Sequence, residues 1–433
     1  MNVVVIGAGI AGLAAARTLR RAGVSVVVVE ARRRVGGRIW TDNALGAPVD
    51  LGASWVHGFV PENPIVPVVE ALGVDVCSFL PGRIVLRGAG GNIITEVSGW
   101  VLALFELLAD RAERLIQENS DDVPVSAYVD ELFEDMPIPP AIGHKLRLWT
   151  KSVFANYMAA EMDEVSLKYF DDDEEFLGEH CLFTHGGALL VERLAVGLDV
   201  RLGYVVQAVE YGPAGVRVIG ERDTIYADCA IVTLPLGVLK AGAVHFDPPL
   251  PPEKRAAVER LGMGSLEKVV LRFPRQWWPD EMVLAIMSTD EAPVFPSFIN
   301  LARCVDAPLL MGFLGGQRAR EWTARSDGAI VERALQELRH VFGHTRVPEP
   351  TGITITRWDH DPFARGAYSF IPVGAAGEDF ETLATPVVGR LFFAGEATIR
   401  RYYGTIHGAY ASGLRAAGEV LTSAVGTPVV SSQ

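Results

Sequence analysis

The first thirty residues alternate between apolar runs and short breaks in a regular order. Four consecutive β-branched residues, Val3 to Ile6, predict a buried parallel strand. The alanine-rich stretch from Leu13 to Arg21, with basic residues near its end, predicts a helix. A second apolar run, Val26 to Val29, predicts another strand. The chain therefore begins with a strand–helix–strand unit.

Glycines fill the turn between the first strand and the helix, at Gly7, Gly9 and Gly12. The first allows a tight turn, the second lets a pyrophosphate approach the backbone, and the third allows close packing of helix on strand. Glu30, at the end of the second strand, is placed to accept hydrogen bonds from a ribose. Together these features predict a dinucleotide site, since a glycine-rich turn without a ligand leaves Glu30 unexplained.

The rest of the chain shows both periodicities, without repeats or low-complexity tracts. Helical spacing of apolar residues predicts helices, and short apolar runs predict strands. Residues 422–433 are expected to form a loose tail. The expected helices cover 68–72, 100–115, 142–158, 329–341 and 408–421; the expected strands cover 200–217, 224–233, 269–273, 309–314, 353–357 and 390–398, with a hairpin over 83–95.

Composition narrows the class of protein. A chain of 433 residues accommodates two or three domains, and 49% hydrophobic with 21% charged residues fits a soluble globular enzyme. No apolar stretch reaches the ~20 residues that a membrane-spanning helix needs. The net charge of −14 disfavours nucleic acid and anionic membranes as partners and favours a cationic small molecule.

The four cysteines, Cys77, Cys181, Cys229 and Cys304, are scattered without CxxC spacing. This argues against a metal site and against a disulfide framework, and it predicts a reducing, cytoplasmic location. The apolar N-terminus lacks the basic segment of a signal peptide. Of the three basic residues at 32–34, at least two are expected to be solvated.

Several segments in one order and spacing resemble the FAD-dependent amine oxidases, and within them the polyamine oxidases. The resemblance spans almost the whole chain. It rests on the glycine turn with Glu30, Gly36-Gly37-Arg38, Leu51 to Gly58, Leu234 to Lys240, Lys268 within Leu266 to Val270, Trp358 to Gly374, and Phe393 to Thr398 with His407 to Tyr410.

The resemblance implies an α/β fold of two domains. A Rossmann-like FAD-binding domain of the glutathione-reductase type would be assembled from residues 1–78, 180–262 and 385–433. An α+β substrate domain, a mixed sheet flanked by helices, would use 79–179 and 263–384. The active site would lie where the two domains meet.

The resemblance also assigns residues to the cofactor. Val206 would hold the adenine through its backbone, and Glu396 would lie near the ribityl–pyrophosphate end, unless it is only a helix-capping acid. Ala367 stands where monoamine oxidases have the thiol that bonds the flavin, so FAD is expected to be non-covalent. The full set of implied FAD contacts is Gly7, Gly9, Gly12, Glu30, Arg38, Ser54, Trp55, Val206, Trp358, Glu396, Thr405 and Ile406.

The implied reaction is hydride transfer from the carbon next to an amine nitrogen to flavin N5. The imine is hydrolysed by water, and O2 reoxidises the flavin to give H2O2. Lys268 matches the family lysine that holds a water beside N5; the alternative is a lysine that reaches outward from a strand. Tyr368 resembles one wall of an aromatic cage, and Thr405 stands where monoamine oxidases have the other wall.

A half-open cage favours a polyamine or a similar secondary amine. His57 is expected to hydrogen-bond the amine, or else to be a core histidine. Glu174 or Glu175, in the acidic run 171–175, is expected to pair with a distal ammonium, or else to form a solvated face. Tyr402 would add bulk near the substrate.

Alternatives remain at this point. The same chemistry on a monoamine, a secondary-metabolite amine or an amino acid is open, the last with Arg83, Arg303 or Arg365 binding a carboxylate. Rab GDP-dissociation inhibitors share the fold without flavin, but the intact glycine turn and Lys268 argue against that class. A histone demethylase is disfavoured because no inserted helical tower fits. A monomer or homodimer is expected.

Overall fold

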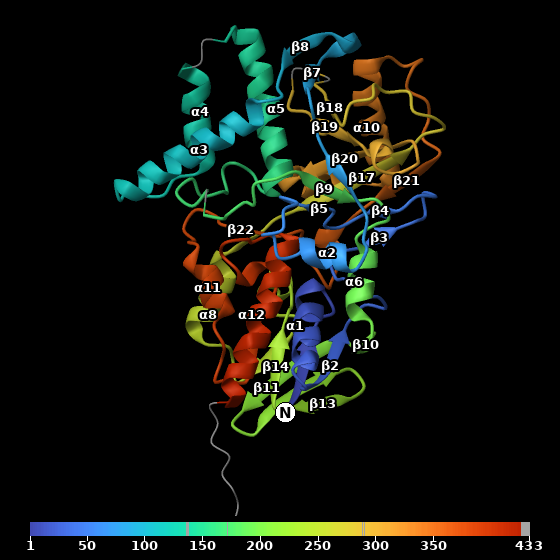
Figure 1. Cartoon of the computed structure of the whole chain (residues 1–433). Helices are drawn as coiled ribbons and strands as arrows, with labels where there is room; N and C mark the ends of the chain where they lie inside the picture. The colour runs from blue at the N-terminus through green and yellow to red at the C-terminus, as the bar shows by residue number, and fades with distance from the viewer. Residues whose placement is uncertain (136–137, 171, 288, 290, 426–433) are drawn as a thin grey trace, which may run out of the picture.

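The computed structural model describes residues 1–135, 138–170, 172–287, 289 and 291–425. Figure 1 shows two halves, one above the other, and the chain passes between them several times. The lower half is built on a parallel sheet and the upper half on an antiparallel one.

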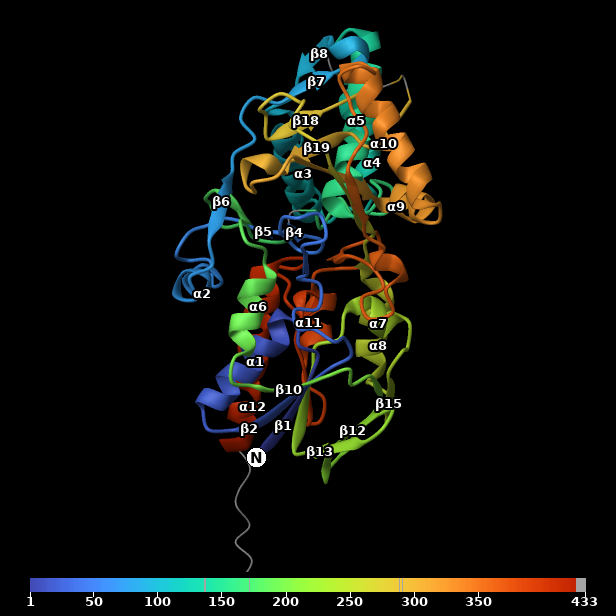
Figure 2. The same ribbon diagram turned by 90° about the vertical axis from the view of Figure 1, so that its right-hand side faces the viewer.

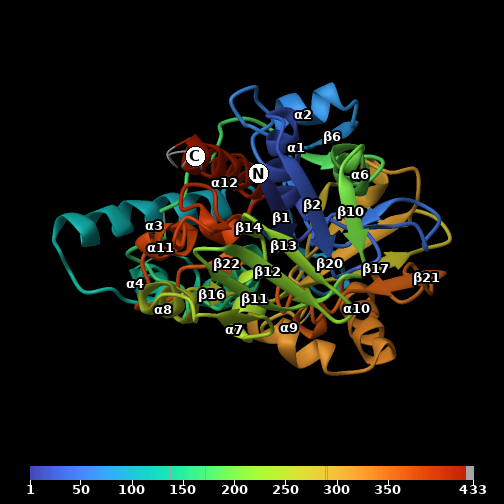
Figure 3. The ribbon, with the colours of Figure 1, turned by 90° about the horizontal axis from the view of Figure 1, so that it is seen from below.

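The parallel sheet takes its strands from three distant stretches of chain. Its order is β10-β2-β1-β14-β23, and all four pairings are parallel. Figure 3 shows β10, β2, β1 and β14 side by side. The strands are β1 (Asn2–Ile6), β2 (Ser25–Glu30), β10 (Asp199–Leu202), β14 (Cys229–Val232) and β23 (Leu391–Phe393).

Helices α1 (Ile10–Arg21) and α12 (Ile406–Val425) lie side by side on one face of this sheet (Figures 1 and 2). They can pack closely because residue 413 is a glycine. A Cβ at Gly413 would lie 2.2 Å from the Ala11 carbonyl oxygen. A four-stranded sheet packs through the apolar core on the other face. Its strands are β11 (Val206–Gly212), β12 (Gly215–Gly220), β13 (Thr224–Ala227) and β15 (His245–Asp247).

Short elements join the two halves. Two small sheets pair β3 (Thr41–Asp42) with β4 (Val49–Asp50), and β9 (His180–Phe183) with both β5 (Trp55–Val56) and β6 (Val76–Phe79). The helices of the lower half and the junction are α2 (Val66–Ala71), α6 (Ala188–Ala195), α7 (Leu236–Lys240), α8 (Pro252–Arg260) and α11 (Glu378–Ala384).

The upper sheet has the order β18-β19-β20-β17-β21, with antiparallel pairing throughout. A parallel bridge from Arg87 to Ile286 attaches the hairpin of β7 (Val85–Arg87) and β8 (Ile93–Glu96) beside it. The strands are β17 (Leu266–Arg272), β18 (Val283–Ala285), β19 (Ser297–Asn300), β20 (Leu309–Gly315) and β21 (Gly352–Ile355). A separate pair joins β16 (Gly262–Met263) to β22 (Ser369–Phe370).

Helices cover this half of the molecule (Figure 1). They are α3 (Trp100–Gln117), α4 (Val125–Asp135), α5 (Pro140–Met158), α9 (Gly316–Thr323) and α10 (Asp327–Phe342). Helix α4 has no counterpart among the sequence-based predictions. The predicted strand over 200–217 is instead three strands, because Gly203 (φ 72°) and Gly215 (φ 125°) turn the chain.

The cysteines correct one expectation. Cys77 and Cys304 form a disulfide with 5.6 Å between their Cα atoms, although 227 residues separate them. The prediction of no disulfide was wrong, because only the fold brings β6 beside the turn that holds Cys304. The expectation of a reducing compartment loses its basis, and the cytoplasmic location stays a prediction. Among the described residues, no helix has the length and hydropathy to cross a membrane.

Candidate active site

The glycine turn has the shape that a pyrophosphate requires. Gly7 adopts φ 106°, and its N–H donates to the Val29 carbonyl at 2.8 Å. A Cβ at Gly12 would lie 2.0 Å from the Gly7 carbonyl oxygen, so the helix can approach the strand only with glycine there. A Cβ at Gly9 would meet nothing within 4 Å. The turn therefore presents bare backbone to open space, which fits a phosphate at the start of α1.

Glu30 is buried at the end of β2, beside this turn. One carboxylate oxygen accepts from Ala8 N and the other from Arg32 N, each at 2.8 Å. A carboxylate oxygen has a second lone pair, so acceptor capacity remains for ribose hydroxyls. The predicted ribose contact is compatible with this geometry and stays a prediction.

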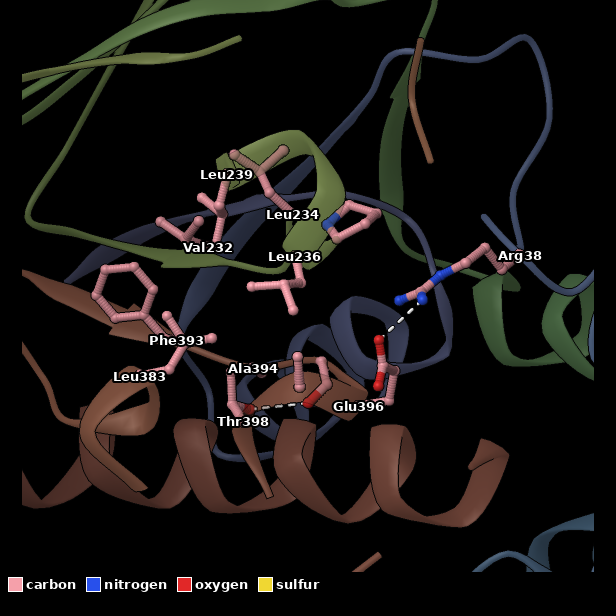
Figure 4. Close-up of a pocket in the computed structure, with 13 residues that line it drawn as sticks. Arg38, Val232, Leu234, Leu236, Leu239, Leu383, Phe393, Ala394, Glu396 and Thr398 are labelled. Carbon is pink, nitrogen blue, oxygen red and sulfur yellow. Dashed lines mark hydrogen bonds and ion pairs between the residues drawn. The ribbon is translucent and has the colours of Figure 1, made fainter. Parts of the chain in front are cut away.

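Arg38 and Glu396 form an ion pair at 2.8 Å, shown in Figure 4. Glu396 is buried and also accepts from Gly404 N at 3.0 Å and from the backbone and hydroxyl of Ser369. It therefore ties three segments together and does not cap α12. The pair borders a small cavity whose other walls are Val232, Leu234 to Leu236, Leu239, Leu383, Phe393 to Gly395, Ala397 and Thr398.

The basic residues that follow Glu30 are mostly engaged. Arg32 makes two hydrogen bonds to Asp361, at 2.7 and 2.9 Å, and Arg34 donates to the Gly37 carbonyl at 2.9 Å. Only Arg33 of the three is exposed. The expectation that at least two are solvated was wrong, because their acceptors come from a distant loop and from the turn itself.

Two further predicted cofactor residues lie in the sheets and at their junction. Val206 begins β11, where a bulge between Val206 and Ala208 interrupts the ladder. Trp358 is buried, and its indole N–H donates to the Leu51 carbonyl at 3.0 Å. Trp40 meets Trp358 edge-on, with 6.1 Å between ring centroids.

Lys268 is buried on β17, so the alternative of an outward-reaching lysine is excluded. Its ammonium donates to the carbonyls of Asp50 at 2.7 Å and Gly52 at 2.6 Å, and to the Ser54 hydroxyl. It also lies 5.5 Å from the centre of the Trp55 ring. Burial lowers the pKa of Lys268 to about 8. Two predicted flavin contacts, Ser54 and Trp55, thus lie against the predicted catalytic lysine.

Tyr368 packs beside Gly404, since a Cβ there would lie 3.4 Å from the Tyr368 ring. Its hydroxyl donates to the Tyr157 carbonyl at 2.6 Å, and burial raises the pKa of Tyr368. Tyr157 donates in turn to Glu175 at 3.3 Å. Sequence reasoning missed Tyr157, because its position near the end of a predicted helix carries no signal of this contact.

Thr405 caps the helix that follows it. Its hydroxyl accepts from Gly408 N at 2.9 Å and donates to the Tyr402 carbonyl at 2.7 Å. Ile406, the first residue of α12, is buried. Position 405, where the resemblance implies the second wall of the cage, therefore holds a small hydroxyl that is already engaged.

His57 lies in a cluster of rings at the junction of the two halves. Its ring centroid is 5.0 Å from that of His180, and Tyr402 lies 5.2 Å from His407 and 5.0 Å from Phe176. Burial lowers the pKa of His57 to about 3 and that of His407 to about 4, so both imidazoles are neutral at pH 7. Sequence reasoning gave no role to His180, His407 or Phe176.

Glu174 and Glu175 of the acidic run are exposed, as a solvated face predicts, but members of the run also pair with arginines. Glu174 pairs with Arg401 through both carboxylate oxygens, and Asp172 pairs with Arg400. Asp171, also part of the predicted run, lies outside the described residues. Glu175 accepts from the Tyr157 phenol, and the backbone carbonyl of the same tyrosine accepts from the Tyr368 hydroxyl, so Glu175 and Tyr368 share Tyr157 as a partner.

Comparison with known proteins gives one consistent family. The model of the flavin containing amine oxidoreductases matches residues 10–89 and 99–421. Polyamine oxidase 2 of Arabidopsis thaliana is 34% identical over 430 residues, which cover 96% of this chain and 87% of that protein. Lysine-specific histone demethylase 2 of Homo sapiens is 33% identical, over 97% of this chain but only 53% of its own length.

Solved structures show the same fold at lower identity. A wild-type putrescine oxidase bound to putrescine is similar at a TM-score of 0.79, with 22% identity over 98% of this chain and 99% of that chain. Cyclohexylamine oxidase from Brevibacterium oxydans IH-35A gives a TM-score of 0.79 at 23% identity, over 98% and 99%.

Proposed function

The chain belongs to the family of flavin-containing amine oxidoreductases, whose cofactor here is FAD, and from that premise we propose that it oxidises a polyamine or a similar secondary amine. The observation that carries the proposal is the buried Lys268 near the junction of the two halves. When bound, FAD would accept a hydride from the carbon next to the amine nitrogen and pass two electrons to O2 as H2O2.

The chain's own residues would bind and orient the FAD. The bare backbone at Gly9 and the start of α1 would receive the pyrophosphate, with Arg38 as its counter-charge. Glu30 would accept from the ribose. The link would be non-covalent, because Ala367 offers no thiol and the two free cysteines, Cys181 and Cys229, lie buried on other strands.

At the reacting end, the residues would keep the amine neutral and control water. An ammonium has no lone pair to stabilise the forming imine, and an apolar aromatic site lowers an amine pKa by desolvation. Tyr368 would supply one wall of that site. Lys268 would hold the water beside the flavin by exchanging for it one of the three hydrogen bonds that it makes to Asp50, Gly52 and Ser54. His57, which is neutral, would accept a hydrogen bond from the substrate nitrogen.

The preference for a polyamine is supported by the open side of the cage and by the acids beside it. Thr405 leaves room opposite Tyr368 for a longer chain. Glu175, whose partner Tyr157 also contacts Tyr368, would pair with a distal ammonium. Glu174 is a weaker candidate because Arg401 already neutralises it. Polyamine oxidases also match this chain over most of their length, whereas the human demethylase above does not.

Anaerobic mixing with an amine panel tests the proposal. Spermine, spermidine, N-acetylspermine, putrescine, benzylamine and L-amino acids would each be mixed with the yellow protein, and flavin absorbance followed near ~450 nm. Fast bleaching by polyamines is the expected result. Bleaching by benzylamine or an amino acid alone would overturn the substrate, and no bleaching by any amine would overturn the activity.

A further inference from the structure

One buried carboxylate has no part in the steps above. Glu267 precedes Lys268 on β17 and is 0% exposed. Successive side chains on a strand point to opposite faces, so the Glu267 carboxylate lies on the face away from the Lys268 ammonium. It accepts from the Thr356 hydroxyl at 2.5 Å and from Asp359 N at 3.2 Å. Both partners belong to the turn after β21 that carries Trp358.

The same turn is bonded to the backbone of Lys268. Lys268 N donates to the Thr356 hydroxyl at 2.8 Å, and Thr356 N donates to the Lys268 carbonyl at 3.0 Å. The Ser265 hydroxyl donates to the Asp359 carboxylate. Residues 356–359 are therefore fixed to β17 through Glu267 and through residues on either side of it.

The start of this strand also holds Tyr368. Gly264 N donates to the Tyr368 carbonyl, and Ala367 N donates to the Gly264 carbonyl, both at 2.8 Å. Residues 264–268 thus set the relative positions of Lys268, Trp358 and Tyr368. Lys268 and Tyr368 are the side chains that we place at the reacting end of FAD, and Trp358 is a predicted FAD contact.

We propose that Glu267 is a positioning residue that aligns Lys268 and Trp358 for the flavin by holding the turn 356–359 against β17. This inference rests on the proposed function. A carboxylate suits the place because both partners are donors, and only a carboxylate offers two acceptor oxygens. Burial raises the pKa of Glu267 to about 7, which reflects the free-energy cost of burying its charge. The protein keeps an acid here although an apolar side chain would avoid that cost.

Glu267→Gln in the FAD-loaded protein tests the inference. Glutamine keeps the shape but replaces one acceptor oxygen by an NH2 donor, so that either Asp359 N faces a donor or the Thr356 hydroxyl loses its acceptor. We expect the rate constant of flavin reduction by spermine to fall at least about tenfold, since small misplacements near the reacting atoms carry such losses. The spermine concentration at half-maximal rate should change less than about threefold. The FAD dissociation constant should also rise, and the visible flavin band should shift.

Glu337→Gln is the matched control. Glu337 is another buried acid, and it accepts from Val294 N and Phe295 N, both at 3.0 Å, and from the Arg333 guanidinium at 2.8 Å. Glu337→Gln should lower the melting temperature by an amount similar to Glu267→Gln. It should leave flavin reduction, FAD affinity and the flavin band unchanged. Equal slowing in both variants would reduce Glu267 to a general stability role and overturn the proposal.

A second pair of variants keeps the test decisive if Glu267→Gln does not fold. Thr356→Val removes the hydroxyl that links Glu267 to Lys268 N, whereas Thr356→Ser retains it. Valine should reproduce the slow reduction and the shifted flavin band, and serine should not. Unchanged kinetics, spectrum and FAD affinity in Thr356→Val would overturn the proposal. If no amine reduces the wild type, the proposed function fails, and FAD affinity and the flavin band still decide the role of Glu267.

Discussion

The glycine turn and the surroundings of Lys268 differ in how far apart along the chain their partners lie. Glu30 bonds Ala8 across 22 residues, within one strand–helix–strand unit. Lys268 bonds Asp50 across 218 residues, and Tyr368 bonds Tyr157 across 211. The glycine turn is therefore a local structure, although the Arg38–Glu396 pair beside it spans 358 residues. The contacts of Lys268 and Tyr368 exist only once distant segments have packed. We therefore expect substitutions at the glycine turn to affect folding, and substitutions around Lys268 to affect the reaction.

Gly12→Val should have the largest effect at the nucleotide end. Its Cβ would lie 2.0 Å from a backbone oxygen, so α1 cannot stay against β1. We expect a loss of more than about 3 kcal/mol and insoluble or colourless protein. The measurements are soluble yield and the ratio of flavin to protein absorbance.

Gly9→Ala is the control for Gly12→Val. Its Cβ meets nothing within 4 Å, so the apoprotein should melt within a few degrees of the wild type. The added methyl group occupies the space offered to the pyrophosphate, so FAD affinity should fall. A Gly9→Ala protein with wild-type FAD affinity would contradict the placement of the phosphate.

Lys268→Met should slow flavin reoxidation by O2 about 10²-fold, because the group that holds the water is gone. FAD binding should weaken less than reoxidation slows, because two of the three Lys268 hydrogen bonds go to the backbone carbonyls of Asp50 and Gly52 and one goes to Ser54, a predicted FAD contact. Stopped-flow mixing of reduced protein with O2 measures the rate. Lys254→Met, at a buried lysine bonded to the Thr382 and Leu383 carbonyls, should lower stability without this slowing.

The pH dependence of stability gives an independent measure of Lys268 burial. Its pKa is about 8 in the native protein against 10.5 in the unfolded chain. Between these values the unfolded chain holds a proton that the native protein lacks, so the free energy of unfolding rises with pH. As the pH rises from about 8 to 10.5, the free energy of unfolding from denaturant melts should increase for the wild type relative to Lys268→Met. Parallel curves would show that the ammonium is solvated.

Thr405→Ala should have a smaller effect. Losing the cap of α12 should cost about 1 kcal/mol of stability. Turnover should stay close to that of the wild type, because the hydroxyl is engaged by Gly408 N and the Tyr402 carbonyl. Thermal melts and steady-state assays measure both quantities, and a large loss of turnover at full stability would give Thr405 a direct role in the reaction.

Glu175→Gln should have the smallest effect. Glu175 is exposed, so its pair with a substrate ammonium is worth less than about 1 kcal/mol. We expect the Michaelis constant for spermine to rise two- to fivefold, as roughly that energy allows, with benzylamine unaffected. Glu174→Gln is the comparison, and its effect should be weaker because Arg401 holds that acid. A larger rise of the Michaelis constant in Glu174→Gln than in Glu175→Gln would identify Glu174 as the acid that pairs with the distal ammonium.

Much of the fold followed from local pattern. The strands around Val3 and Val26, the helix between them, and most later elements lie close to where periodicity placed them. The family followed from motif order, which the comparisons confirm. Contacts between residues far apart in the sequence could not be predicted from local pattern. The Cys77–Cys304 disulfide, the Arg32–Asp361 pair and the contact of Tyr368 with Tyr157 each join segments that no spacing relates.

By itself, the sequence determined the strand–helix–strand unit, its glycine turn and the membership of a flavin amine oxidase family. Backbone freedom at glycine and the periodicity of apolar residues act within a few turns of chain, so they can be read in order. Tertiary structure alone decided that Tyr157 contacts both Tyr368 and Glu175, what Lys268 and Thr405 bond, and how Glu267 fastens the turn at Trp358. These contacts depend on how the two halves pack, and packing brings together residues whose separation along the chain carries no local signal.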